Sequence, residues 1–472
     1  MASDGSAGLA WVFDIGSTFT KLAVIDLGKE RLVASASAPT TVDTDVLLGV
    51  RNVIEKASRD GGVRFEDAEL SLACSSAAGG LSMAVVGLVP ELTVEAARLA
   101  VLGAGARVAA AFAYELTPEE QRSLEEAEPD IVLLTGGTDG GQRRALLRNA
   151  EILAQLGMRV PVIVAGNKDV GFEAAETLRT HGHRDVEVVP NVLPSVDEMN
   201  VEPVRRAIRE MFLRRITRAK GIDRAEALIG GGVVMPTPAA VLRAARVIAD
   251  GLSGVAGLGE LVVCEVGGAT TNVHSIAKGA PTGAGVVWRG LPEPREKRTV
   301  EGDLGVRWNA PGILEVLGEE RLSAVGGSTF EDVGERVDLL RAHPAVLPDD
   351  ETGRRFDEAL AASAIGLALT RHSGSLDETY TPNGRVMIQH GKDLTNIGVL
   401  IGTGGALIHS HRRKMVLDSA LEQCDDPLIL TPRHPKCFVD SRYLLYTVGL
   451  MADTAWAHAA LRVFLQNLQE VG

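Results

Sequence analysis

The sequence predicts an α/β protein in which parallel sheets are covered by helices. Over residues 130–189, short apolar runs of strand length alternate with longer amphipathic stretches of helical length. Such alternation is typical of parallel sheets, whose ligand sites lie at the carboxyl ends of the strands. The chain also holds 52 glycines and only 4% aromatic residues, which suits tight turns between elements and aliphatic cores.

The first half of the chain begins with three expected strands over 9–38, followed by a helix near 46–58 and a strand at 68–74. Strands and helices then alternate. The later strands are expected at 130–134, 160–165 and 186–189, and the helices at 143–156, 171–181, 200–219 and from about Pro236. We predict a first lobe over 1–255. Its α/β block at about 129–255 is either an inserted domain or a continuation of that lobe.

The second half, residues 256–472, is predicted to form another lobe. The stretch at about 277–397 differs from its surroundings because prolines punctuate charged, irregular sequence, with one long helix expected over 351–373. We interpret it as an insertion. An apolar pattern of helical length over 443–468 closes the chain.

Charge and composition argue against nucleic-acid and membrane partners and against cysteine-based motifs. The 48 basic and 62 acidic residues give a net charge of -14, which disfavours nucleic acid and anionic membrane surfaces as partners. No apolar run reaches the roughly 20 residues of a membrane span, and the first residues lack a signal-peptide pattern, so a cytoplasmic protein is expected. Four scattered cysteines form neither a disulfide framework nor a CxxC knuckle.

The segment Val12–Lys21 has the pattern of a hairpin that binds phosphate. A strand ends in Asp14, Gly16 allows a tight turn, and Ser17 and Thr18 add hydroxyl donors. Lys21 adds a positive charge, and Asp14 is placed to hold Mg²⁺ through water. An ordinary two-strand turn with a capping Asp is the alternative for this segment taken alone.

Two segments downstream complete the pattern. Residues 261–273 repeat the order of strand, acid, glycine turn, hydroxyls and strand; the candidate ligands there are Glu265, Gly267, Gly268, Thr270 and Thr271, with Glu265 as a second water-mediated Mg²⁺ holder. Residues 399–407 form an apolar strand that ends in small residues and leaves room for a base or ribose. The candidates there are Gly402, Thr403, Gly404 and Gly405.

A fourth glycine-rich loop, 136–141, follows the expected strand at 130–134. Gly136, Gly137 and Thr138 are candidates for cofactor binding because they lie at the carboxyl end of a strand in an α/β pattern. A tight turn without a ligand explains the same residues equally well, and the sequence leaves both interpretations open.

The three ordered segments resemble the phosphate-1, phosphate-2 and adenosine motifs of the ASKHA superfamily, which includes actin, Hsp70-type chaperones and sugar kinases. This resemblance implies a two-lobed actin-like ATPase fold, ribonuclease H-like in each lobe, with an inserted α/β region. It also implies ATP and Mg²⁺ at the hinge, with Asp14 and Glu265 as the catalytic acids.

A narrower resemblance covers nearly the whole chain. The motifs that carry it are Asp14–Lys21, Thr40–Val46, Leu133–Gly141, Val266–Thr271, Arg298–Gly305 and Ile401–Gly405. They are similar to the glutamate mutase accessory proteins, called GlmL or, in older usage, MutL, which are unrelated to mismatch repair. The resemblance implies an ATP-driven chaperone that reactivates an adenosylcobalamin-dependent mutase, with the mutase subunit and ATP or ADP as partners; whether the chain forms a homo-oligomer is left open.

Two residues depart from the superfamily pattern. Glu265 stands where Asp is usual, and Asn272 stands where an acid is common. The extra methylene of Glu265 holds metal or water differently, so we expect slow ATP hydrolysis. A small-molecule kinase of the same fold and an iron–sulfur dehydratase activator are the alternative functions.

Overall fold

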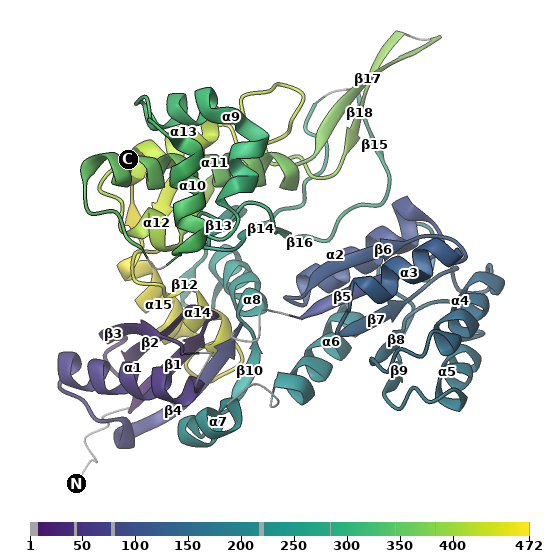
Figure 1. Cartoon of the computed structure of the whole chain (residues 1–472), viewed down its shortest axis with the longest axis horizontal. Helices are drawn as coiled ribbons and strands as arrows, with labels where there is room; N and C mark the ends of the chain where they lie inside the picture. The colour runs from purple at the N-terminus through teal and green to yellow at the C-terminus, as the bar shows by residue number, and fades with distance from the viewer. Residues whose placement is uncertain are drawn as a thin grey trace. The chain divides into compact units, whose positions relative to one another are not determined.

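The computed structural model describes residues 8–41, 45–76, 81–216, 221–283, 285–344, 346–382 and 384–471. The chain divides into two compact units. Figure 1 labels the helices and strands of both. Unit 1 comprises Met1–Ala240 with Gly290–Pro294, and unit 2 comprises Val241–Arg289 with Arg295–Gly472. The predicted limits of the two lobes, 1–255 and 256–472, and of the regions within them stay predictions.

The first sheet of unit 1 has the strand order β10-β4-β1-β2-β3. Its strands are β1 (Leu9–Ile15), β2 (Phe19–Asp26), β3 (Arg31–Pro39), β4 (Ala68–Ser75) and β10 (Val233–Pro236). The strands β1, β2 and β3 form an antiparallel meander, and β4 and β10 continue the sheet in parallel with β1. The three strands expected over 9–38 are therefore confirmed.

Helix α1 (Val46–Gly61) covers this sheet because its apolar residues share one face. The Asp45 side chain caps the helix by accepting a hydrogen bond from the Leu47 N–H at 3.0 Å. Gly62 ends it in the left-handed conformation, with φ of 62°. Val50, Val53 and Ala57 are fully buried, so this face forms part of the core.

A second, wholly parallel sheet lies between β4 and β10 in the chain. Its order is β6-β5-β7-β8-β9. The strands are β5 (Ser82–Val86), β6 (Arg107–Phe112), β7 (Ile131–Leu134), β8 (Val162–Val164) and β9 (Val186–Val188), and the helices are α2 (Glu95–Gly103), α3 (Pro118–Glu126), α4 (Arg144–Gln155), α5 (Gly171–Thr180) and α6 (Val201–Ile216). This is the predicted inserted α/β region, and its first two strands precede residue 129.

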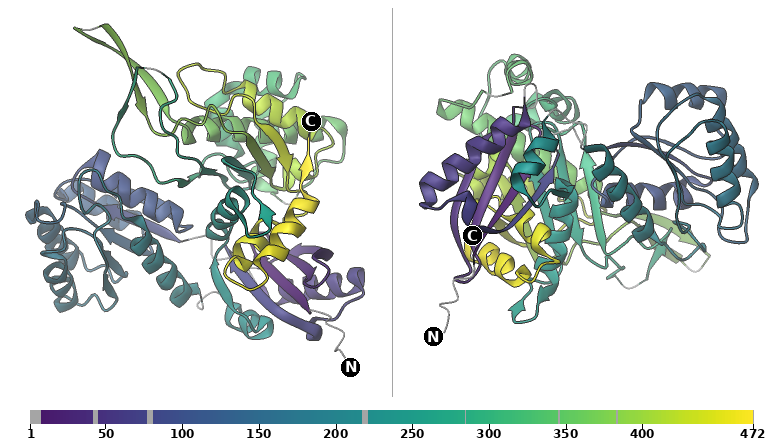
Figure 2. Two further views of the ribbon diagram at one scale, coloured as in Figure 1. Left: turned by 180° about the vertical axis from the view of Figure 1, so that it is seen from behind. Right: turned by 90° about the horizontal axis from the view of Figure 1, so that it is seen from below.

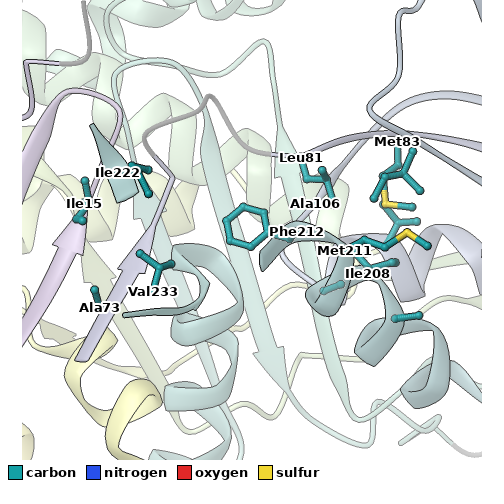
Figure 3. Packing of buried hydrophobic residues seen from close by; sticks show 14 of the residues in the cluster. Ile15, Ala73, Leu81, Met83, Ala106, Ile208, Met211, Phe212, Ile222 and Val233 are labelled. Carbon is teal, nitrogen blue, oxygen red and sulfur yellow. The ribbon is translucent and has the colours of Figure 1, made fainter. Parts of the chain in front are cut away.

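One hydrophobic core links the two sheets of unit 1. It includes Ile15 and Ala73 of the first sheet, Met83 of the inserted sheet, and Met211 and Phe212 of helix α6 (Figure 3). Helix α6 also contacts β10. The inserted region and the first sheet thus share buried apolar surface.

The main sheet of unit 2 repeats the strand arrangement of the first sheet of unit 1. Its order is β16-β14-β13-β19-β20-β21. The strands are β13 (Leu261–Val266), β14 (Thr271–Ile276), β16 (Glu296–Glu301), β19 (Val399–Thr403), β20 (Lys436–Val439) and β21 (Gln469–Glu470). β13, β14 and β16 form the antiparallel meander, and β19 and β20 continue parallel to β13. This duplication is the predicted actin-like fold.

Helices cover the sheet of unit 2. They are α9 (Ala310–Gly326), α10 (Val333–Ala342), α11 (Glu351–His372) and α13 (Arg413–Glu422). Helix α11 contacts β13, β14, α9 and α13, and its many buried alanines allow this close packing on several sides. The region expected as an insertion at about 277–397 thus supplies both β16 and α11 to the body of unit 2.

A smaller sheet of unit 2 contains β15 (Val286–Arg289), β17 (Ser375–Thr381) and β18 (Gly384–His390). Figure 2 shows β17 and β18 as a long hairpin that extends from the rest of unit 2. The chain closes with α14 (Leu445–Met451) and α15 (Ala457–Asn467). Among the described residues, no helix is long and apolar enough to cross a bilayer.

Candidate functional site

The first candidate turn joins β1 to β2 over residues 16–18. The Gly16 N–H donates to the Phe19 carbonyl at 3.1 Å, and the Thr40 N–H donates to the Thr18 carbonyl at 2.9 Å. A Cβ at Gly16 would lie 2.6 Å from the Phe19 carbonyl oxygen, so the turn requires glycine at this position. Ser17 and Thr18 are exposed at its tip, where their hydroxyls can meet a ligand.

Asp14 lies at the base of this turn and is 2% exposed. Its Oδ2 accepts from the Lys21 ammonium at 3.1 Å, and its Oδ1 accepts from the Thr237 hydroxyl at 2.6 Å. Cys74 Sγ lies 3.6 Å from the same Oδ1. Burial raises the pKa of the Cys74 thiol, and the charge of Asp14 raises it further. Cys74 therefore stays a neutral donor.

The second candidate turn, 267–270, has the same construction. The Gly267 N–H donates to the Thr270 carbonyl at 2.9 Å, and a Cβ at Gly267 would lie 2.8 Å from that oxygen. Glu265 pairs with Asn272 across β13 and β14, as Asp14 pairs with Lys21 across β1 and β2. The two turns are therefore repeats of one local structure, one in each unit.

Glu265 is half-buried at the end of β13. The Asn272 amide donates to Glu265 Oε2 at 3.4 Å. Arg298 of β16 donates to Asn272 Oδ1 from Nε at 3.2 Å and from Nη2 at 2.8 Å. The acid of the second turn thus belongs to a chain of three polar side chains.

The segment 304–309, which we call the clamp, fixes the second turn by hydrogen bonds. The Val306 N–H donates to the Gly267 carbonyl at 3.1 Å, the Arg307 and Trp308 N–H groups each donate to the Gly268 carbonyl at 2.9 Å, and Asn309 Nδ2 donates to the Ala269 carbonyl at 2.7 Å. Arg307 is anchored in turn by Asp357 of α11, with Nη2 to Oδ2 at 2.5 Å. The conformation of the turn is therefore tied to helix α11.

Thr271, a predicted phosphate ligand, is fully buried. Its hydroxyl donates to the Leu304 carbonyl at 2.6 Å, so this side chain holds the clamp against the turn. Thr270 is half-buried, and Gly268 is partly exposed beside it. Ala269 is exposed between them, so in the second turn the residues that can meet a ligand are Gly268, Ala269 and Thr270.

The loop after β19 packs on the end of β13, next to the second turn. Gly404 has φ of 113°, and a Cβ there would lie 2.1 Å from the Val266 carbonyl oxygen. Gly402 faces the core, since its Cβ would lie 2.4 Å from Leu407 Cδ2. Thr403 is also buried, whereas Gly405 is exposed. Gly404 is buried as well, so Gly405 is the one exposed residue among the four candidates predicted to accept a nucleoside.

The glycine-rich loop after β7 is ordered by two buried asparagines. Asn191 Nδ2 donates to the Gly137 carbonyl at 3.0 Å and to Asp139 Oδ1 at 2.9 Å. Asn167 Nδ2 donates to the Gly141 carbonyl at 3.2 Å. Gly136 and Gly137 are buried, while Thr138 is half-buried. The loop lies in the inserted sheet, and a cofactor role for its three candidates stays a prediction.

Sequence reasoning missed Thr237 and the clamp, and it did not give Arg298 a role. Thr237 lies 223 residues from Asp14 in sequence, so no local pattern connects them. Arg298 begins a motif noted for its family resemblance, but only the pairing of β16 with β14 brings it to Asn272. Residues 296–301 contain one apolar residue, Val300, so no alternation of apolar residues marks this strand in the sequence.

A duplicated three-plus-two sheet with matched acid–glycine turns defines a protein of the actin-like fold class. Comparison with known families then gives the narrower assignment: the chain belongs to the MutL protein family, whose sequence profile matches residues 10–468. Protein MutL of Clostridium tetanomorphum is 43% identical over 462 residues, which cover 98% of this chain and 99% of that relative.

Solved structures show only distant likeness. The nucleotide-free structure of acetone carboxylase is 12% identical, with a TM-score of 0.40 over 94% of this chain and 70% of the other. Component A of (R)-2-hydroxyglutaryl-CoA dehydratase from Acidaminococcus fermentans is 11% identical, with a TM-score of 0.31 and coverage of 98% and 99%. Xylulose kinase from Bifidobacterium adolescentis is 12% identical, with a TM-score of 0.34 and coverage of 98% and 96%. Likeness at this level says nothing about activity.

Proposed function

We propose that this chain is an ATP-dependent accessory protein that reactivates an adenosylcobalamin-dependent mutase. The observation that carries the ATP-binding part is the pair of matched turns, each with a carboxylate at its base and a glycine that closes it. The nomination of glutamate mutase or a related aminomutase as client rests on the sequence resemblance to the glutamate mutase accessory proteins.

The phosphates of ATP are assigned to both turns in this proposal. In unit 1 the ligands are the Ser17 and Thr18 hydroxyls and the Lys21 ammonium, while Gly16 closes the turn. In unit 2 they are the backbone of Gly268 and the Thr270 hydroxyl, while Gly267 and Thr271 support the turn. The nucleoside is assigned to the loop of Thr403, Gly404 and Gly405, with Gly402 packed beneath it.

In this proposal Asp14 and Glu265 are the candidates to hold a Mg²⁺ ion through its waters. Carboxylates are the side chains this ion prefers, and the ion commonly keeps several of its waters. The Asp14 carboxylate accepts hydrogen bonds from the Thr237 hydroxyl and the Lys21 ammonium, and these contacts fix its position at the base of the first turn. When bound, Mg²⁺ would neutralise charge that develops on the phosphate oxygens.

Hydrolysis in such a site depends mainly on positioning and charge neutralisation. Glu265 orients the attacking water, and Lys21 offsets the charge of the terminal phosphate. Loss of that phosphate removes contacts made by both turns, so the two units become free to change their arrangement. A mutase that binds one arrangement more tightly is then released or opened, and damaged cobalamin can leave.

A reactivation assay tests the proposal. The protein is mixed with ATP, Mg²⁺, fresh adenosylcobalamin and a mutase from the same genome whose cofactor has been inactivated. We expect mutase turnover to return with ATP and to stay absent with a non-hydrolysable ATP analogue. No recovery with any such mutase, together with ATP-dependent phosphorylation of a metabolite, would favour the small-molecule kinase instead.

The dehydratase-activator alternative has less support from the structure. An iron–sulfur cluster shared between two copies needs cysteines at the surface. All four cysteines of the chain, Cys74, Cys264, Cys424 and Cys437, are buried. Iron analysis of the purified protein tests this point, and stoichiometric iron would reopen the alternative.

A further inference from the structure

The two matched turns differ in how they hold their acid. In both hairpins the acid pairs with the residue seven positions later on the neighbouring strand. In unit 1 that residue is Lys21, whose ammonium contacts Asp14 Oδ2 at 3.1 Å. In unit 2 it is Asn272, a neutral amide, so the same position in the repeat carries no charge.

A cation on the neighbouring strand, Arg298, is linked to Glu265 through the side chain of Asn272. Arg298 lies on β16 beside β14, and the residue is 4% exposed. Nε and Nη2 both donate to Asn272 Oδ1, at 3.2 Å and 2.8 Å. This forked contact occupies the amide oxygen, and the amide nitrogen therefore faces Glu265.

Arg298 remains a cation under the conditions in which the site works. Burial lowers the pKa of its guanidinium to about 10, and the charge of Glu265 acts in the opposite direction. At neutral pH the residue is protonated. The charge of Arg298 therefore polarises the Asn272 amide and strengthens its hydrogen bond to the Glu265 carboxylate.

We propose that Arg298 is a positioning residue that holds the Glu265 carboxylate through the side chain of Asn272, in the role that Lys21 has toward Asp14. The catalytic part of this inference rests on the proposed function, because it assumes that Glu265 acts in ATP hydrolysis. The structural part, that Arg298 and Asn272 fix the Glu265 side chain, does not depend on it.

Three variants separate this role from general support of the fold. Arg298→Met removes the positive charge and both hydrogen bonds to Asn272 Oδ1. Arg298→Lys keeps the charge but has a single donor group. Asn272→Lys combined with Arg298→Met rebuilds in unit 2 the direct pair found in unit 1. Supporting partners of this kind commonly cost 10- to 100-fold in activity or metal affinity when removed.

We expect Arg298→Met to lower kcat for ATP hydrolysis, and to raise the Mg²⁺ concentration needed for half-maximal rate, by about 10- to 100-fold. Arg298→Lys should lose less, and the double variant should recover at least part of the loss. In a Glu265→Gln background, Arg298→Met should cause no further loss of rate, because the effect acts through Glu265. Merely structural damage would not be reversed by Asn272→Lys.

Crystal structures of the parent and the variants decide the structural part by themselves. The Glu265 carboxylate should keep its position in the parent and in the double variant, and move in Arg298→Met. If Arg298→Met does not fold, Asn272→Leu replaces it in the same comparison. An unmoved Glu265 carboxylate, or a rate unchanged by Arg298→Met, would overturn the inference. A parent protein without any ATPase activity would refute the proposed function, while the crystallographic comparison would still test the positioning.

Discussion

At the scale of single residues, Asp14 depends on a partner that no local pattern reveals. The Thr237 hydroxyl donates to its Oδ1 at 2.6 Å inside the buried base of the first turn. A hydrogen bond to a charged, buried group contributes about 1.5–3 kcal/mol. Thr237→Val should therefore lower the free energy of unfolding by about that amount, measured by chemical denaturation, whereas Thr237→Ser should retain most of it. Equal stability of the two variants would show that the hydroxyl is unimportant.

Substitution of two buried histidines in unit 2 should have opposite effects on stability. His372 is fully buried and pairs with Ser275 Oγ and Thr299 Oγ1, each at 2.8 Å. Among the described residues, His274 is also fully buried but neither of its ring nitrogens has a hydrogen-bond partner. His372→Leu should cost about 1–3 kcal/mol, because it leaves buried hydroxyls unpaired, whereas His274→Leu should be neutral or stabilising. Thermal unfolding of both variants checks this difference.

The lowered pKa values of the same histidines predict that stability depends on pH. Burial lowers the pKa of both His274 and His372 well below the usual 6.5, with nearby cations adding to the effect. The unfolded chain then binds more protons than the folded one at acid pH, so stability is fully present above about 6.5 and falls as pH decreases. Each histidine adds up to about 1.4 kcal/mol per pH unit. His274→Leu should flatten the fall of melting temperature between pH 7 and pH 5; an unchanged slope would contradict this account.

At the scale of elements, the clamp connects the second turn to helix α11 through the Arg307–Asp357 pair. Both side chains are almost buried, and burial raises the pKa of the Asp357 carboxyl despite the opposing charge of Arg307. Removing one partner of such a pair commonly costs about 3–5 kcal/mol, while replacing both by apolar residues costs much less. Arg307→Met should therefore speed amide hydrogen exchange in residues 266–272, and Arg307→Met with Asp357→Leu should largely restore protection. Equal exchange rates in the parent, the single variant and the double variant would show that the Arg307–Asp357 pair does not stabilise the turn.

Elements with strong local signals were predicted from the sequence, and those defined by distant contacts were not. The turn at Gly16 and the helix capped by Asp45 depend on neighbouring residues, so their patterns are visible in the chain. The role of β16 depends on its pairing with β14, and prolines around it suggested an irregular insertion instead. The burial of Thr271 was missed for the same reason, because its partner Leu304 belongs to a separate segment.

At the scale of the whole molecule, the central feature is the repeat of one sheet and one turn in two units. The repeat explains why two acids, Asp14 and Glu265, occupy equivalent strand ends although their surroundings differ. Family membership and sequence resemblance add a mutase client to the proposal, whereas the repeat itself supports only the binding of a phosphate-bearing ligand. The account therefore depends on whether residues of both turns contribute to ATP binding.

Isothermal titration of the protein with ATP and Mg²⁺ tests this claim most directly. The parent protein should bind one ATP per chain. Lys21→Met in the first turn and Thr270→Val in the second should each weaken binding by about tenfold, since a lost charge-assisted or buried hydrogen bond is worth about 1.4 kcal/mol or more. Arg64→Met, which changes an exposed ion pair with Asp67 remote from both turns in sequence, serves as the control and should bind like the parent. Absence of ATP binding by the folded parent, or affinity unaffected by both turn variants, would contradict the account.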